Sequence, residues 1–155
     1  KKIESYIVGN KKIDFEEILK LTNLAENFNT SELIDNCLSK NHKKTVNILN
    51  ENNFSSEDSI LIIKTLLNRS KRLLDLKRKS ELNKNLEECI SSYKPPIFWK
   101  DKDIVKQQMN NWSLKNIENL IYEINEIELL AKKNSSNSLN IISDFLINQS
   151  SKLSN

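Results

Sequence analysis

YKPPIFWKDKD, residues 93–103, is the stretch of sequence that decides the fold. It holds both prolines of the chain, Pro95 and Pro96. Three large apolar residues follow at once: Ile97, Phe98 and Trp99. Adjacent prolines remove two backbone donors and disfavour helical backbone in the preceding residue, so a helix arriving from the N-terminal side must stop near Tyr93. Three large apolar residues are costly to leave in water as one patch. The stretch therefore predicts an extended plug, packed between the helices before and after it.

The composition favours one soluble domain built from helices. Its 155 residues are enough for a single core, and 37% hydrophobic with 29% charged residues is typical of a folded chain. One glycine and two prolines supply little turn chemistry for hairpins, which argues against a β-rich fold. No apolar run approaches the roughly 20 residues needed to span a bilayer, and no signal peptide is visible. We expect a cytoplasmic location, and we expect Cys37 and Cys89 to be buried thiols.

Two helices are predicted before residue 22. Apolar spacing over residues 1–8 ends at Gly9, and glycine caps a helix C-terminus without steric cost. Asp14 and Glu17 then match a capping box, which predicts a short helix through about residue 21. Because the chain opens with Lys1 in the middle of a helical pattern, we expect it to be the C-terminal part of a longer protein.

Asn29 and Glu32 repeat the capping-box pattern and predict the start of another helix. Its apolar face is Leu33, Ile34, Cys37 and Leu38. A weaker helix follows over residues 42–51. It carries His42, the only histidine, and we expect this side chain to be exposed because no further metal-ligating residue lies at a suitable spacing.

The longest predicted helix spans residues 56–79 and is capped by Ser55. Its inward stripe is Ile63, Leu66, Leu67, Ser70, Leu73 and Leu74. Seven basic residues against one acid lie between positions 64 and 79. On the face opposite the stripe, the basic residues are Lys64, Lys71 and Arg78 at seven-residue spacing, flanked by Arg72 and Lys79. This basic face is either a solvated helix surface or a footprint for nucleic acid or an acidic partner. No aromatic residue is interleaved among these charges, which argues against a stacking platform for single strands.

Four further elements are predicted around and after the proline break. They are a short helix over 86–90, a helix capped by Asp101, a helix capped by Ser113, and a last helix over 138–151 preceded by a polar loop at 134–137. Trp112 precedes the cap of the third helix and can pack onto Ile117. Glu128 falls inside the apolar stripe of that helix, and we expect it to pair either with Lys132, four residues later, or across an interface.

No motif for catalysis or cofactor binding is present. The chain has no phosphate loop, no GxGxxG, no CxxC pair and no nucleophile elbow. One histidine and one glycine leave few catalytic constellations to build. We expect no cofactor and no enzymatic activity from this chain alone.

Three pieces of the sequence together resemble the C-terminal region of the delta subunit of bacterial DNA polymerase III, most closely its alphaproteobacterial members. The pieces are SELIDNCLSKN (31–41), the long basic helix, and the run from YKPPIFWKDKD to AKKNSS (93–136). The most telling features are the PPIFWK break, the segment 108–112 ahead of a Ser-capped helix, and the grouping of Glu126, Glu128 and Lys132. Residues 1–24 are similar to the end of the family's small lid domain. Where many relatives place a glycine near Asn134, this chain has Ser and Asn.

The resemblance implies a part in assembling a clamp loader, as a non-catalytic subunit of a DNA-directed DNA polymerase, a nucleotidyltransferase holoenzyme. Residues 1–27 would be the remnant of the AAA+-like lid domain, and residues 28–155 the all-α collar, a helical bundle for oligomerisation. The collar packs against the delta-prime and gamma/tau subunits. The sliding clamp is bound only through an N-terminal domain outside this sequence, and DNA is touched indirectly or weakly. The residues expected at the plug or at an interface are Pro95, Pro96, Phe98, Trp99, Trp112 and Glu128.

Two other readings stay open. One is a helical nucleic-acid-binding module that uses the basic face of the 56–79 helix directly. The other is an unrelated helical scaffold domain.

Overall fold

The computed structural model describes residues 14–83 and 85–153, and within these ranges the chain is all-helical, with seven α-helices and no strand. The helices are α2 (Phe15–Leu38), α3 (His42–Glu51), α4 (Asp58–Asn83), α5 (Leu86–Ser91), α6 (Lys102–Asn111), α7 (Leu114–Lys133) and α8 (Ser138–Ser151). Two 3₁₀ turns, η1 (Trp99–Asp101) and η2 (Ser135–Asn137), precede α6 and α8. The predicted all-α bundle is confirmed. The expected helix before Gly9 lies outside the described residues.

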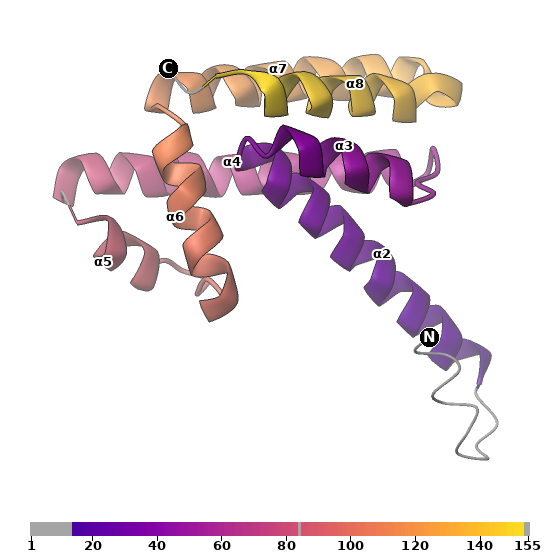
Figure 1. Cartoon of the computed structure of the whole chain (residues 1–155), viewed down its shortest axis with the longest axis horizontal. Coiled ribbons are helices and arrows are strands. Elements are labelled where there is room, and N and C mark those ends of the chain that lie inside the picture. Colours follow the sequence, from indigo (N-terminus) through magenta and orange to yellow (C-terminus); the bar gives the residue numbers. More distant parts are fainter. Residues whose placement is uncertain (1–13, 84, 154–155) are drawn as a thin grey trace.

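The long helix α4 is the central element of the bundle. It packs most extensively against α7, and Figure 1 shows α7 and α8 running beside it as a hairpin. α6 runs steeply across α4 and leads up to the start of α7, and α5 lies next to the C-terminal end of α4. The core gathers the apolar faces of these helices, and its largest fully buried side chains include Leu33, Ile62, Leu66, Met109 and Ile124.

Helix α2 differs from the expectation of two short helices divided near residues 22–28. It is one continuous helix from Phe15 to Leu38, since no glycine or proline interrupts it. Asp14 occupies the N-cap position without a side-chain cap bond, so the predicted capping box is not formed. Thr22 donates its hydroxyl to the carbonyl of Ile18 at 2.9 Å, a bond back onto the preceding turn that is compatible with an uninterrupted helix.

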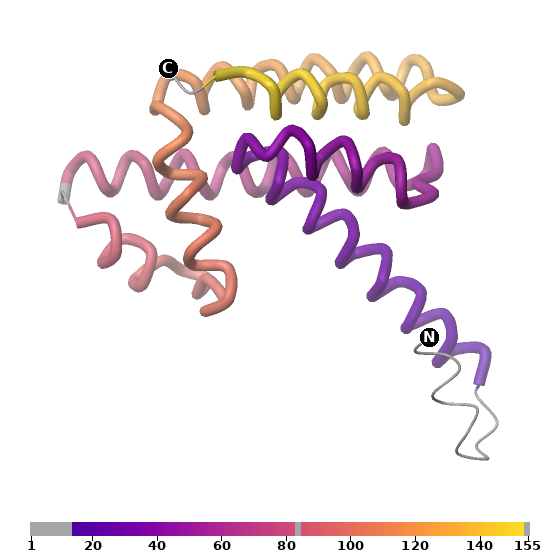
Figure 2. Tube along the Cα trace, viewed as in Figure 1, coloured from indigo at the N-terminus to yellow at the C-terminus, as the bar shows by residue number. Residues whose placement is uncertain are grey.

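The two halves of α2 have different surroundings. Residues from Thr30 onward are largely buried in the bundle, whereas Phe15, Leu24 and Phe28 are mostly exposed. Figure 2 shows this first half leaving the bundle as a projecting arm. The expected division between residues 27 and 28 therefore falls inside a continuous helix, close to the point where packing begins.

The predicted caps of α4 and α7 are confirmed, whereas Asp101 occupies the N-cap position of α6 without a side-chain cap bond. Ser55 and Asp58 cap α4 reciprocally: the Ser55 backbone N–H donates to the Asp58 carboxylate at 2.6 Å, and Asp58 N–H donates to the Ser55 hydroxyl at 3.3 Å. Ser113 caps α7 by accepting from the Asn116 backbone N–H at 3.2 Å. The buried stripe of α4 is wider than predicted, because Ile62 and Leu76 are also fully buried while Leu67 and Leu74 are only partly so.

The predicted plug is wrong in its main feature. Ile97 is buried, but Phe98 and Trp99 are 56% and 69% exposed, and both prolines are exposed as well. Successive side chains on extended backbone point to opposite sides, so Ile97 faces the core while Phe98 faces outward. Trp99 then begins η1, which directs the chain into α6.

Candidate interaction surfaces

The basic face of α4 divides into paired and unpaired cations. Arg78 pairs with Glu118 on α7 at 2.9 Å, and Lys79 pairs with Asp75 at 3.0 Å. Arg72 is half-buried, and burial lowers the pKa of its guanidinium. Lys64 and Lys71 are exposed and form no ion pair with any acid in the described ranges. The positive charge of this face that is both exposed and unpaired is therefore carried by two lysines at seven-residue spacing.

Tertiary structure brings the Tyr93 ring to the C-terminal end of this face and gathers two further rings in the segment that follows, which the sequence did not predict. The Lys79 ammonium lies 5.1 Å from the centroid of the Tyr93 ring. Phe98 and Trp99 stack at a tilt with their centroids 5.9 Å apart, and the Lys100 ammonium lies 5.4 Å from the Trp99 ring. Aromatic residues are absent from positions 64–79 of the helix itself, but the chain returns beside it through the proline break.

Trp112 belongs to the core rather than to an exposed interface. Only 5% of its surface is exposed, and its indole N–H donates to the Leu38 carbonyl at the end of α2, at 2.7 Å. The Lys40 ammonium sits 3.6 Å from the ring centroid and also donates to the Gln149 carbonyl at 2.9 Å. Burial lowers the pKa of Lys40 to about 8, while Glu123 nearby favours the charged form. This cluster joins the ends of α2, α6 and α8.

A buried ion pair at the junction of α2, α4 and α6 carried no recognisable sequence signal. Arg69 donates to the Asp35 carboxylate at 2.9 Å, and both side chains are largely buried. Gln108 donates to the Asp35 carbonyl at 3.2 Å. Burial raises the pKa of Asp35, and Arg69 opposes that effect. The two sequence positions, 34 residues apart, meet only through the packing of the helices.

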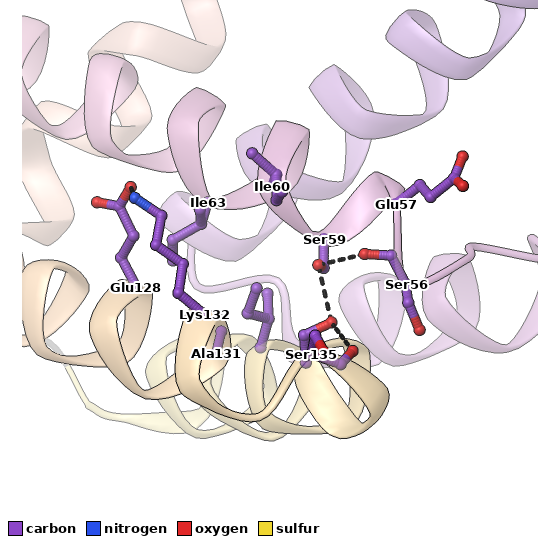
Figure 3. Close-up of a pocket in the computed structure, with 11 residues that line it drawn as sticks. Ser56, Glu57, Ser59, Ile60, Ile63, Glu128, Ala131, Lys132 and Ser135 are labelled. Carbon is purple, nitrogen blue, oxygen red and sulfur yellow. Dashed lines mark hydrogen bonds and ion pairs between the residues drawn. The ribbon is translucent and has the colours of Figure 1, made fainter.

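Glu128 is paired within its own helix, as predicted. Its carboxylate lies 2.8 Å from the Lys132 ammonium, one turn later on α7. The pair stands at the edge of a cleft of about 310 Å³, drawn in Figure 3, between the N-terminal end of α4 and the α7–α8 hairpin.

The walls of this cleft are mainly apolar. Ile60 and Ile63 come from α4, Ala131 from α7 and Ile142 from α8. The Ser59 hydroxyl donates to that of Ser138 at 3.0 Å, which satisfies the polar groups at the cleft floor within the protein. Ile60 is 48% exposed at the mouth. The cleft thus offers an apolar depression for a side chain or ligand that needs few hydrogen bonds.

The outer face of α7 carries three further exposed apolar side chains, Tyr122, Leu129 and Leu130.

His42 is exposed, as predicted, and its Nδ1 lies 3.0 Å from the Ser150 hydroxyl. Across residues 14–83 and 85–153, no group of three potential ligand residues converges on a metal site. In the same part of the chain, no helix has the length and apolar character to cross a membrane.

Comparison with known proteins adds no identification: no family model, no curated protein and no solved structure matches the chain.

Proposed function

We propose that this chain is the helical collar portion of a DNA polymerase III delta subunit, and that its work is to assemble the clamp loader with the delta-prime and gamma/tau subunits in the cytoplasm. In this role it is a non-catalytic part of the polymerase holoenzyme. The sliding clamp is bound by another part of the subunit.

The observation that carries this proposal is the exposure of large apolar side chains on a well-packed bundle. Two of them, Phe98 and Trp99, belong to the segment that carries the sequence resemblance. A core that can bury Leu66, Met109 and Ile124 completely leaves these aromatics in water, which is the pattern of a surface that a partner covers. Tryptophan and other aromatic residues are also enriched at the centres of protein interfaces.

The projecting arm of α2 supports the same proposal. Its exposed Phe15, Leu24 and Phe28 would be expected to pack against the lid domain, of which residues 1–27 are the proposed remnant. The packed bundle begins close to the proposed start of the collar at residue 28.

Size exclusion with light scattering, on the chain alone and mixed with the delta-prime and gamma/tau subunits of its organism, tests the proposal. We expect co-elution as a stoichiometric complex, with about 800 Å² buried on each partner at a standard contact. The double variant Phe98→Ser with Trp99→Ser should weaken the complex, whereas Leu82→Ser, at another exposed apolar position, should not. A wild-type chain that elutes separately from both subunits would argue against the collar role.

A second function, direct binding of single-stranded nucleic acid, is favoured by one specific observation. The structure places Tyr93 and the Phe98–Trp99 pair beside cations, with Lys79 and Lys100 close to aromatic rings. Exposed rings among cations can stack on bases while the cations neutralise phosphates. The candidate site for single strands is therefore the aromatic cluster with Lys100, whereas Lys64 and Lys71 keep the exposed unpaired charge of the α4 face.

Fluorescence anisotropy of a labelled oligothymidylate distinguishes this second function. Binding should weaken steeply with salt and should be lost in Trp99→Ala, while Lys64→Glu has little effect. Unchanged anisotropy at low salt and high protein concentration would exclude it.

A further inference from the structure

Helix α4 presents an apolar row beside a basic row, both with a seven-residue repeat. The apolar row is Ile60, Leu67 and Leu74, and the basic row is Lys64, Lys71 and Arg78. Ile60 is exposed, whereas the two leucines are partly buried and pack with one side against the core. Seven residues are about two helical turns, or about 10.5 Å, so each row runs nearly along the helix axis.

This arrangement of rows is the one found on helices that pack against a second helix. In helix pairs with a seven-residue repeat, apolar residues form the seam and charged residues beside it select the partner. The α4 face has both parts, and its flanking charge is of one sign. Arg78 is already neutralised by Glu118, which leaves Lys64 and Lys71 as the cations able to select an incoming acid.

The cleft at the end of the row supplies an anchor point. Ile60 belongs to both the apolar row and the cleft mouth, and the cleft continues inward to Ile63, Ala131 and Ile142. Its volume of about 310 Å³ is sufficient for one large apolar side chain. Because Glu128 is paired with Lys132, the nearest acid on α7 need not repel an acidic partner. Glu57 also lines the cleft and would repel an acid there. The partner therefore places its apolar anchor at the cleft and its acids further along α4.

We propose that this face, defined by Ile60, Lys64, Leu67 and Lys71, docks an amphipathic helix of a partner protein whose apolar stripe is flanked by Asp or Glu. The inference rests on the proposed assembly function, and it names the chemistry of one partner surface. A phosphate backbone would also meet the two lysines, but it would leave the apolar row and the cleft unused, so a protein helix fits more of the surface.

Charge reversal with a matched control tests the proposal. Lys64→Glu with Lys71→Glu changes the docking face, while Lys43→Glu with Lys133→Glu makes the same change in net charge at exposed lysines elsewhere. Ile60→Ser removes the exposed apolar group at the cleft mouth. Circular dichroism should show that each variant remains folded, since all five positions are exposed.

Two measurements on the full chain separate this inference from the proposed function. The first is the affinity for the delta-prime and gamma/tau subunits. We expect the docking-face double variant to lose about tenfold or more in affinity and the control double variant to bind as the wild type does. Equal binding by both variants would overturn the docking surface and leave the assembly function standing.

The second measurement uses a synthetic probe and does not depend on those subunits. A fluorescent helical peptide of about three heptads, with leucine in the seam and glutamate beside it, is titrated against its counterpart with lysine in place of glutamate. We expect only the acidic peptide to bind, and Lys64→Glu with Lys71→Glu and Ile60→Ser each to weaken it. If neither peptide binds, or if both bind alike, the inference fails even where the subunits assemble. Duplex DNA that binds this face while the acidic peptide does not would likewise overturn it.

Discussion

At the scale of single residues, the Arg69–Asp35 pair is the most consequential contact in the bundle interior. Desolvation raises the pKa of Asp35, so placing its carboxylate there costs free energy that Arg69 only partly offsets. Removing the Arg69 cation should therefore lower the free energy of unfolding more than neutralising Asp35 does, because it leaves the buried Asp35 carboxylate without its partner.

We predict that Arg69→Met lowers the free energy of unfolding by about 3 kcal/mol, and that Asp35→Asn lowers it by about 1 kcal/mol. Asparagine keeps an oxygen that can accept from Arg69, whereas methionine offers Asp35 no donor. Urea unfolding followed by far-UV circular dichroism at pH 7 measures both values. Equal losses, or a larger loss for Asp35→Asn, would contradict this account of the pair.

The same pair predicts a pH dependence with a definite sign. An acid whose folded pKa is raised binds more protons in the folded state, so its charge costs stability as the pH rises above the ordinary pKa. In Arg69→Met the free-energy cost of the charged Asp35 carboxylate is larger, because the cation that offsets burial is gone. The stability gap between Arg69→Met and wild type should therefore narrow as the pH falls through the raised folded pKa toward the ordinary value. A gap that is constant with pH would show that Asp35 is not the source of the loss.

The two tryptophans allow one substitution to be compared in two environments. Trp112→Phe removes the donor to the Leu38 carbonyl and part of the ring beneath Lys40, which should cost about 2 kcal/mol. Trp99→Phe, at an exposed ring, should change stability by less than about 0.5 kcal/mol. Urea unfolding of the two variants checks this difference. Similar effects at both positions would mean that Trp112 is not the structural residue its contacts indicate.

At the scale of secondary-structure elements, local signals predicted the starts of helices where a cap and an apolar face coincide. Ser55, Ser113 and the spacing over α3 and α8 all led to helices near their observed positions. The same signals failed at Asn29, where a cap pattern lies inside a helix that simply continues. A capping residue permits a helix start, but without a glycine or proline before it nothing obliges the preceding helix to end.

The Ser113 cap gives an element-scale prediction. Its hydroxyl accepts from the Asn116 backbone N–H, one of the donors that the first turn of α7 would otherwise leave unpaired. Ser113→Ala should lower the free energy of unfolding by about 1 kcal/mol. Ser136→Ala, the same substitution at an exposed residue of η2, is the control and should change it by less than about 0.5 kcal/mol. If the two variants are equally stable in urea, the cap contributes nothing measurable.

At the scale of the whole molecule, the contacts that define the surfaces join residues far apart in sequence. Gln108 reaches Asp35 across 73 positions, and Trp112 reaches Leu38 across 74. Helical periodicity shows which side of each helix is apolar, but it does not show which helices meet or how far a neighbour extends. For that reason the sequence predicted the basic row and the Glu128–Lys132 pair, which are local, and missed the cleft, the buried ion pair and the approach of Tyr93 to Lys79.

Whole-molecule packing also predicts how much of the chain the bundle needs. None of residues 15–28 is buried, so deleting residues 1–27 removes an arm without opening the core. Asn29 and Glu32, whose capping pattern is unused in the continuous helix, then become available to cap the shortened α2. We expect the chain from Phe28 onward to unfold in one cooperative transition, within about 1 kcal/mol of the intact chain in urea. A loss above about 2 kcal/mol would mean that the arm belongs to the same cooperative unit, and the division between residues 27 and 28 would then be wrong.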